Sequence, residues 1–239
     1  MDIQKKLLTV LPNSEENRDI LKIDMHVHSQ YSNDSIIPIE TLVRTWRKHG
    51  IISLVCDHDT LEGSKRVMRA IRGLNPEIPE ILAEEITTTG GEIIGVFLTE
   101  EIPAGLSSEE TIDTIHDQGG LSIVPHPFCR YRSRALVRSI LDELIPRINI
   151  IEGYNSRNVV DADNLVAVSY ANEKGKPISA GSDAHTPLEL SRVWLDIPVF
   201  ETPVGLLSNL ARASIHFKQS PPGVHLFTKM VKLKKKKHH

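Results

Sequence analysis

Two histidines and an aspartate recur at every second position in the segment KIDMHVHS, residues 22–29. Side chains alternate between the two faces of a β-strand, so a strand here places Asp24, His26 and His28 on one face. Burying that face is costly unless its polar groups find partners. A divalent metal ion is one such partner, because neutral imidazole ligates it and a nearby carboxylate orients the ring. Two hydrogen-bonded histidines at a strand end have the same spacing, so the rest of the chain must decide.

Further metal-capable residues follow four later segments that are predicted to be strands. Each is a His, Asp or Glu at the carboxyl end of its segment, the edge at which α/β sheets and barrels place their sites. Taken singly, each also has a structural explanation; His126, between two prolines, could form a rigid turn. Their common position favours a shared site. These residues are Asp57, His58, Glu84, Glu85, His126, Asp183 and His185.

Apolar patterning predicts an alternation of strands and helices along most of the chain. Strands are expected at residues 20–28, 51–56, 81–86, 92–98, 121–124, 148–151, 178–180 and 193–199. Helices are expected at residues 39–49, 62–74, 107–118, 133–145, 161–174 and 204–211. This alternation predicts an α/β fold with a parallel sheet and one hairpin, at Gly90 and Gly91.

Length and composition are those of one globular domain: 239 residues, 40% hydrophobic and 25% charged. We expect an N-terminal extension at residues 1–18 and the main domain at 19–228. Residues 229–239 form a basic tail, interpreted as a frayed end or as part of a purification tag.

The charge and the cysteine content limit the classes of binding partner and the cellular compartment that we expect for this protein. A formal net charge of -3 gives no overall positive field for nucleic acid. Cys56 and Cys129 are the two cysteines, so no disulfide framework is implied and a reducing cytoplasm is expected. No apolar run is long enough for a membrane span, and we expect no membrane partner. The sequence does not indicate an oligomeric state.

These motifs, in this order, resemble those of the polymerase-and-histidinol-phosphatase (PHP) superfamily. The resemblance extends over about residues 21–199 and implies a distorted seven-stranded (β/α)7 barrel with two or three divalent metal ions. Nitrogen and oxygen ligands without thiolate favour Mn, Zn or Fe. The motifs that carry the resemblance are His26-x-His28, Asp57-His58, Glu85, Pro125-His126-Pro127 and Gly181-Ser182-Asp183-Ala184-His185.

The resemblance also implies three overlapping sets of metal ligands. By motif, they are His26, His28, Glu85 and Asp183 for the first metal, Glu85 and His126 for the second, and Asp34, His58 and His185 for the third. The chain departs from the family pattern at Glu92, where a histidine is often found. Glu92 is therefore either an oxygen ligand or a sign that the second metal is held weakly.

The implied activity is that of a metal-dependent phosphoric ester hydrolase, in which a metal-bridging hydroxide attacks phosphorus. Its catalytic residues are Asp183, His185, Glu85 and Asp57, the last by orienting a ligand. Arginine matches phosphate oxygens well, so the expected substrate-binding residues are Arg130, Arg132, Asn155 and Arg157.

The substrate class stays open among a small phosphate monoester, a nucleotide and the 5′ end of an oligonucleotide. Two other functions are also compatible with the motifs. One is a metal-dependent amidohydrolase, which also opens with His-x-His on a barrel strand. The other is a non-catalytic PHP module that binds metal.

Overall fold

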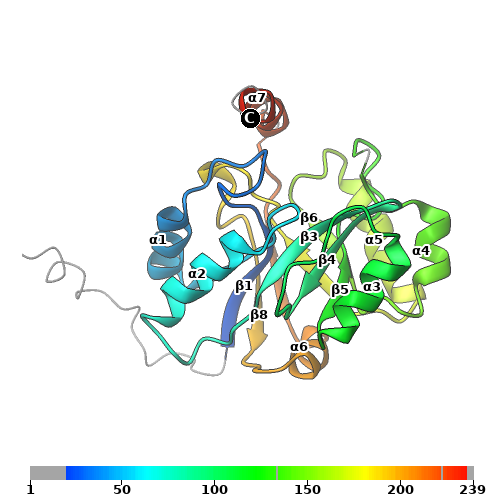
Figure 1. The fold of residues 1–239 in the computed structure, drawn as a ribbon, viewed down its shortest axis with the longest axis horizontal. Coiled ribbons are helices and arrows are strands. Elements are labelled where there is room, and N and C mark those ends of the chain that lie inside the picture. Colours follow the sequence, from blue (N-terminus) through cyan, green and yellow to red (C-terminus); the bar gives the residue numbers. More distant parts are fainter. Residues whose placement is uncertain (1–19, 133, 222, 236–239) are drawn as a thin grey trace, which may run out of the picture.

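The structure is a computed structural model that describes residues 20–132, 134–221 and 223–235. Its strands form two sheets, with helices packed on their outer sides (Figure 1). The extension expected at residues 1–18 lies outside the described residues. No helix in the described part of the chain is long and apolar enough to cross a membrane.

The first sheet has the strand order β2-β1-β8-β9. Its members are β1 (Ile20–Val27), β2 (Ile51–Val55), β8 (Val193–Pro198) and β9 (Ser214–Phe217). β1 runs parallel to β2 and antiparallel to β8, so it lies inside the sheet and is shielded on both edges. Helices α1 (Ile39–His49) and α2 (Glu62–Arg72) lie side by side on the outer face (Figure 1).

The second sheet contains, in spatial order, β3 (Ala83–Thr88), β4 (Gly91–Val96), β5 (Leu121–Val124), β6 (Ile150–Asn155) and β7 (Ile178–Gly181). β5, β6 and β7 are parallel, whereas β3 and β4 form an antiparallel hairpin. The outer side carries α3 (Ser108–Asp117), α4 (Arg138–Leu144) and α5 (Asp161–Glu173) (Figure 1). α3 begins as the sequence suggests, with Ser107 and Glu110 forming a capping box.

The described residues do not form the expected closed, seven-stranded (β/α)7 barrel, and the sheets are not purely parallel. The fold is mixed α/β, with two sheets linked by isolated bridges that join Val27 to Ala184 and His58 to Glu85. The antiparallel β3–β4 pair has a local cause, because the two-residue turn at Thr89 and Gly90 reverses the chain without a crossover helix. Both bridges lie at the strand ends that carry the expected metal ligands.

Two elements near the C-terminus are absent from the sequence prediction. β9 completes the first sheet, and α7 (Val224–Lys235) crosses the domain boundary expected after residue 228. α7 lies at the opposite end of the molecule from α6 (Pro203–Leu210) (Figure 1). The helix expected at residues 133–145 begins later, as α4, because the residues before it belong to the loop that follows His126.

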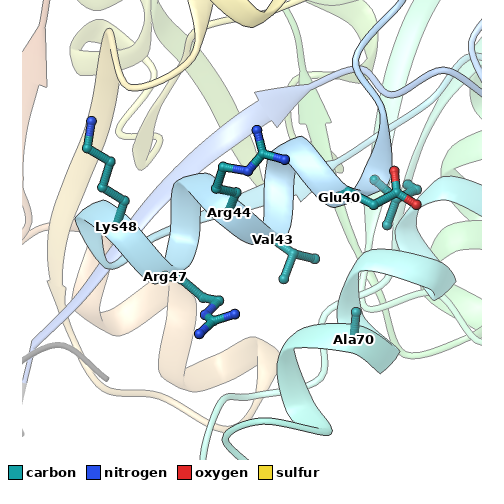
Figure 2. Close-up of a pocket in the computed structure, with 7 residues that line it drawn as sticks. Glu40, Val43, Arg44, Arg47, Lys48 and Ala70 are labelled. Carbon is teal, nitrogen blue, oxygen red and sulfur yellow. The ribbon is translucent and has the colours of Figure 1, made fainter. Parts of the chain in front are cut away.

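A hollow of about 700 Å³ lies along α1 and α2, on the outer side of the molecule (Figure 2). Val43 and Ala70 contribute apolar surface, and Arg44 and Lys48 border it with positive charge. Among the described residues, its lining includes neither a histidine nor a cysteine, and Glu40 is the single carboxylate. We assign it no catalytic role, because the chemistry-bearing residues are gathered elsewhere.

Candidate metal centre

The two faces of β1 have opposite chemistry, as the alternation predicts. Ile23, Met25 and Val27 belong to the apolar core. His26 and His28 are fully buried on the other face, which is turned toward the second sheet. The backbone N–H of His28 donates to the carbonyl of Ala184 at 2.9 Å, so the end of β1 is joined directly to the segment after β7.

Four side chains form what we call the inner cluster: His26, His28, Glu85 and Asp183. His26 Nε2 lies 3.1 Å from His28 Nε2, 3.6 Å from Glu85 Oε2 and 3.7 Å from Asp183 Oδ1. Ligand atoms held about 2.0–2.2 Å from a tetrahedral metal ion are about 3.3–3.6 Å apart. The spacing of these four atoms therefore matches the ligand shell of one shared ion.

His126 and Glu92 extend the inner cluster on the side of the β3–β4 hairpin. His126 Nε2 lies 3.2 Å from Glu85 Oε1 and 3.8 Å from Glu92 Oε2. Glu92 Oε1 is 3.7 Å from His58 Nδ1, and the Glu92 side chain is buried. Glu92 thus points its oxygens into the cluster, in the orientation that an oxygen ligand requires.

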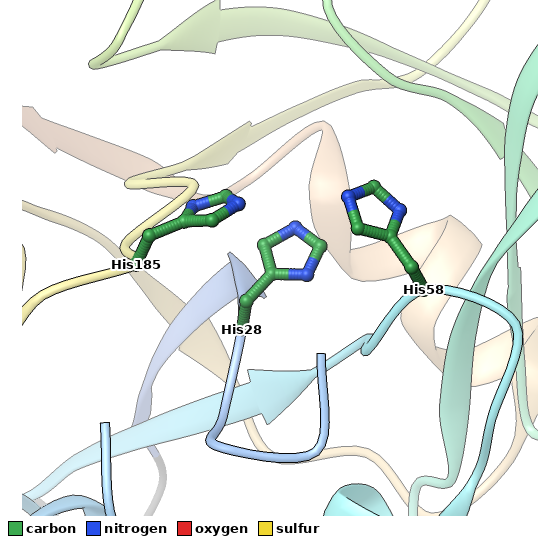
Figure 3. Close-up of side chains that lie close together, drawn as sticks. All are labelled: His28, His58 and His185. Atoms are coloured by element: carbon green, nitrogen blue, oxygen red, sulfur yellow. The ribbon is translucent and has the colours of Figure 1, made fainter. Parts of the chain in front are cut away.

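Three more side chains form the outer cluster: Asp34, His58 and His185. Asp34 Oδ2 lies 3.5 Å from His58 Nε2, and Asp34 Oδ1 lies 3.3 Å from His185 Nε2. His28 connects the two clusters, because one nitrogen from each of His28, His58 and His185 lies within 4.8 Å of the others. Figure 3 shows these three rings grouped with their edges turned toward one another.

The polar atoms at the centre of the inner cluster fit bound divalent metal ions. Within the described residues, Glu85 Oε2 and Asp183 Oδ1 are buried without a hydrogen-bond partner. A buried carboxylate oxygen without a donor is costly. Yet Glu85 Oε2 lies 3.2 Å from nitrogens of both His28 and His58. Lone pairs that converge on a common centre in this way are satisfied together by a cation.

The buried charges keep the Asp183 carboxylate ionised and the His185 ring neutral. Burial alone raises a carboxyl pKa, but Arg132 and His26 hold the pKa of Asp183 well below its usual range. Burial, helped by the nearby charge of Arg157, lowers the pKa of His185 to about 3. His185 is therefore neutral, the form in which imidazole ligates metals. Burial opposes protonation of His28, but Asp183 and Glu85 raise its pKa to about 9.

Glu152 of β6 orients two of the ligands, and the sequence analysis does not identify it. Its Oε1 lies 2.9 Å from His26 Nδ1, and its Oε2 accepts from the backbone N–H of His126 at 2.7 Å. When His26 donates from Nδ1 to this carboxylate, its Nε2 is left for a metal. The available signal was an acidic residue directly after the segment 148–151, as at the other strand ends.

Close backbone approach and unusual backbone angles bring β7 against β1. A Cβ at Gly181 would lie 2.2 Å from the Cβ of His26, so only glycine permits this packing. Asp183 and His126 have φ values of 53° and 33°, a conformation that is uncommon for residues other than glycine. Both residues carry expected ligands, and such strain is concentrated at functional sites.

Asp57 and Asn155 lie beneath the ligands. Asp57 accepts hydrogen bonds of 2.6 Å from both the backbone N–H and the hydroxyl of Ser29, the residue after His28. The Asn155 amide donates to Glu152 Oε2 at 2.9 Å and to Asp183 Oδ2 at 3.1 Å. Both side chains are fully buried, and the Asn155 amide is bonded to protein carboxylates.

A pocket of about 280 Å³ opens over the outer cluster, with Asp34, His58 and His185 in its wall. Arg132 and Arg134 line one part of it, and α7 contributes further lining residues. Arg132 also forms an ion pair with Asp183. The pocket therefore places positive side chains beside the ligand atoms.

The other two expected substrate-binding arginines are engaged by the protein. Arg130 pairs with Asp163 at 2.8 Å, and it is not among the described residues that line the pocket. Arg157 does line it, but its Nη1 is 2.6 Å from His185 Nδ1 and its Nη2 donates to Thr228 at 2.7 Å. Its Nε lies 3.1 Å from Glu189 Oε1, in an ion pair between two buried side chains.

α7 is fastened across the pocket at two points. Thr228 accepts the hydrogen bond from Arg157, which contacts the outer-cluster residue His185. Near the end of the helix, the Lys235 ammonium group donates to the carbonyls of Gln30, Ser32 and Ser35 at 2.9, 2.7 and 2.8 Å. These carbonyls belong to the loop that carries Asp34. The C-terminal helix is thus tied to both sides of the outer cluster.

Comparison with known proteins gives matches in sequence and in fold. The family described as PHP-associated matches residues 161–214. An uncharacterized protein of Methanocaldococcus jannaschii is 37% identical over 178 residues, which cover 73% of this chain and 70% of that protein. A second uncharacterized protein of the same organism is 34% identical over 152 residues, 59% of this chain and 87% of that protein.

One solved structure with the same fold is a two-domain protein of Bacteroides vulgatus, described as containing a predicted PHP-like metal-dependent phosphoesterase. It superposes with a TM-score of 0.65 at 17% identity, over 83% of this chain and 65% of that protein, so the present chain spans less than two thirds of its length. The family match, the 37% identical relative and the shared fold agree with the motifs at the strand ends. The chain belongs to the PHP superfamily.

Proposed function

We propose that this chain is a metal-dependent hydrolase that cleaves small phosphate monoesters. The observation that carries the proposal is the convergence of the inner-cluster atoms at metal-ligand spacing, directly beside a pocket that Arg132 lines. The Bacteroides vulgatus protein of the same fold, described as a predicted metal-dependent phosphoesterase, supports the same class of reaction.

The proposed metal ligands are the residues that the two clusters bring together. When bound, the divalent ions lower the pKa of water toward neutrality and neutralise phosphate oxygens. Glu85 would supply both of its oxygens as ligands, since Oε2 faces His28 and His58 and Oε1 faces His126. The metal ligands in this proposal are His26, His28, Asp34, His58, Glu85, Glu92, His126, Asp183 and His185.

The remaining buried polar residues act on the ligands rather than on substrate. Glu152 fixes the ring of His26 and the backbone of His126. Asp57 holds the turn after His28, and Asn155 holds Asp183. We therefore propose Asp57 and Asn155 as positioning residues, and Arg157 as a link between His185 and α7.

Arg132 is the proposed phosphate-binding residue. Its guanidinium lies between the pocket and Asp183, so it can donate to phosphate oxygens that the ions leave uncovered. A volume of about 280 Å³ is at the lower end for ligand sites, which favours a small ester over a polynucleotide strand. Lys229 of α7, also in the wall, is placed to contact an anionic part of the substrate.

The test is hydrolysis of a substrate panel by the metal-depleted protein and by the same protein supplied with Mn, Zn or Fe. The panel contains a small phosphate monoester, a nucleoside monophosphate and a 5′-phosphorylated oligonucleotide, together with an amide substrate. We expect metal-dependent release of inorganic phosphate, fastest from the small ester. Asp183→Ala should abolish it, whereas His216→Ala, which removes an exposed histidine that pairs with Asp196, should leave it intact.

Each other outcome contradicts a specific part of the proposal. Stoichiometric metal binding without hydrolysis of any substrate would identify a non-catalytic metal-binding module. Turnover of the amide and of no phosphate ester would identify an amidohydrolase. Fastest release from the oligonucleotide would retain the chemistry but contradict the proposed substrate size. A solved structure of the same fold, described as a lesion-specific endonuclease of Pyrococcus furiosus, makes the oligonucleotide an informative member of the panel.

A further inference from the structure

α7 packs with Val224 and two polar side chains inward, while four of its apolar side chains are exposed. Thr228 and Lys235 face the protein, where they bond to Arg157 and to the carbonyls of the Asp34 loop. Leu226, Met230 and Leu233 are 68%, 53% and 59% exposed. A helix on a protein surface normally has the reverse arrangement, with its apolar side against the core.

The exposed apolar residues of α7 form a continuous stripe. Leu226, Met230 and Leu233 are four and three positions apart, the spacing that places side chains above one another on one helix face. Phe227, which is also exposed, flanks them. Single exposed apolar residues are ordinary, but a stripe along the length of one helix marks a surface that contacts something.

The segment that carries this stripe is strongly basic. Eight of the 28 Lys and Arg residues of the chain follow Glu201, whereas none of its 31 Asp and Glu residues do. Six of the eight are lysines in or directly after α7: Lys229, Lys232 and 234–237. An apolar stripe on a helix within such a lysine-rich segment suits the boundary between lipid headgroups and acyl chains.

We infer that the outer face of α7 binds the surface of an anionic lipid bilayer. Apolar side chains enter the headgroup region. The lysines that contact lipid phosphates are those other than Lys229, which lines the pocket, and Lys235, which bonds to the Asp34 loop. A helix of 12 residues is about 18 Å long and cannot span a bilayer, so the contact is peripheral. This goes beyond the sequence analysis, which expects no membrane partner on the basis of absent spans alone.

The charge distribution favours lipid over other occupants. A second copy of this chain would bring two acid-free, lysine-rich segments together, and like charges oppose that contact. A nucleic acid would contact the lysines but leave the apolar stripe uncovered, because its outer surface is the phosphate backbone. An anionic bilayer offers both the negative charge and the apolar environment.

The test is co-sedimentation of the full chain with vesicles of phosphatidylcholine, with and without phosphatidylglycerol as the anionic lipid. We expect binding to the anionic vesicles only. Met230→Glu and Leu233→Glu should each weaken it by about tenfold or more, because a carboxylate replaces a side chain that enters the lipid. Replacing Lys234, Lys236 and Lys237 by Gln should weaken it similarly, and added salt should do the same to the wild type.

The matched control is Val204→Glu, which places the same charge on the exposed side of α6, at the other end of the molecule (Figure 1). It should bind anionic vesicles as the wild type does. Unchanged thermal unfolding and metal content should accompany all variants, since Val204, Met230 and Leu233 are not among the described residues that line the pocket and none of the replaced lysines is a proposed metal ligand.

Three results would overturn the inference. The first is wild-type protein that stays in solution with anionic vesicles. The second is binding that salt abolishes but Met230→Glu and Leu233→Glu leave intact, which would indicate charge alone. The third is a concentration-dependent dimer, dispersed by Leu233→Glu, in a protein that does not bind vesicles; the stripe would then be an interface between copies. None of these depends on whether the proposed hydrolase activity is found.

Discussion

The inner and outer clusters of ligand residues use the same chemistry in different surroundings. The inner cluster, with His26 and Asp183, is fully buried and is held from behind by Glu152 and Asn155. The outer cluster, with Asp34 and His185, forms part of the pocket wall. The inner cluster is thus fixed by the strands, whereas the outer cluster depends on loops and on α7.

This difference indicates a division of labour. Ligands whose other polar atoms are already bonded to the protein are held in position before a metal ion binds. The affinity of such a group for its ion therefore depends little on the substrate. Ligands in a pocket wall are close to both solvent and substrate. We therefore expect the inner cluster to determine whether the site binds metal at all. We expect the outer cluster to determine how the site binds its substrate.

The largest effect should come from the inner cluster. Asp183→Ala or His26→Ala removes a ligand from the shared group, and the transition-state stabilisation that the ions supply is worth several kcal/mol, so we expect turnover to fall by roughly a thousandfold or more. Metal content by elemental analysis should fall with it. A folded Asp183→Ala protein that retained most of its rate and metal would contradict the expectation that the inner cluster determines metal binding.

A smaller effect is expected in the outer cluster. His185→Ala should lower turnover by about a hundredfold and remove one equivalent of metal while the inner equivalents remain, because the inner ligands are intact. Titration with a chelator, followed by elemental analysis, should likewise remove metal from the wild type in two stages. Simultaneous loss of all metal from the His185→Ala protein would mean that the clusters bind as one unit.

Substitution of Glu152 tests whether the hydrogen bonds that orient the inner-cluster ligands account for the difference between the two clusters. Glu152→Ala should weaken metal affinity by about 10- to 100-fold, the usual cost of removing a carboxylate that orients a ligating histidine. Glu152→Gln keeps an acceptor for His26 and should lose less. Glu84→Gln changes a neighbouring buried carboxylate whose Oε2 accepts from the backbone of Ile102, and it should leave the affinity near the wild-type value. Equal losses in Glu152→Gln and Glu84→Gln would show only a general effect of buried charge.

The smallest effect concerns the pocket wall above the outer cluster. Arg132→Ala should lower kcat/KM by about ten- to a hundredfold, because a charge-assisted contact is worth about 1.5–3 kcal/mol. Arg130→Ala, in the same loop but paired with Asp163, should stay within about twofold of the wild type. Steady-state kinetics on the small ester distinguishes the two. Equal effects of both substitutions would mean that phosphate recognition does not depend on Arg132.

Much of the site could be predicted because its residues follow a simple rule of position. His26, His58, His126 and Asp183 each end or follow a buried apolar segment, and such segments can be recognised in sequence. Glu152 follows the same rule but lies beyond the predicted end of its strand, since the apolar pattern stops before the strand does. α7 was not predicted, because the many lysines of this segment make the helical spacing of Leu226, Met230 and Leu233 difficult to recognise.

The role of each arginine could not be predicted from position in the chain. Arg130 and Arg132 are two residues apart and equally suited to phosphate, yet one pairs with Asp163 of α5 and the other with Asp183. Arg157 contacts Glu189, His185 and Thr228, which come from two other segments, the turn after β7 and α7. Such pairings depend on which surfaces packing brings together, and side-chain spacing carries no information about them.

The sequence by itself determined the kind of site: the alternation of residues 23–28 predicts one apolar and one polar face, and the order of the motifs identifies the family. Tertiary structure decided the arrangement of the strands, because the short β3–β4 turn and the return of β8 beside β1 produce two mixed sheets instead of a closed barrel. It also decided the contact between β1 and Gly181, which brings His26 and Asp183 to a common centre. Distances between residues far apart in the chain arise from packing, and local sequence patterns do not contain them.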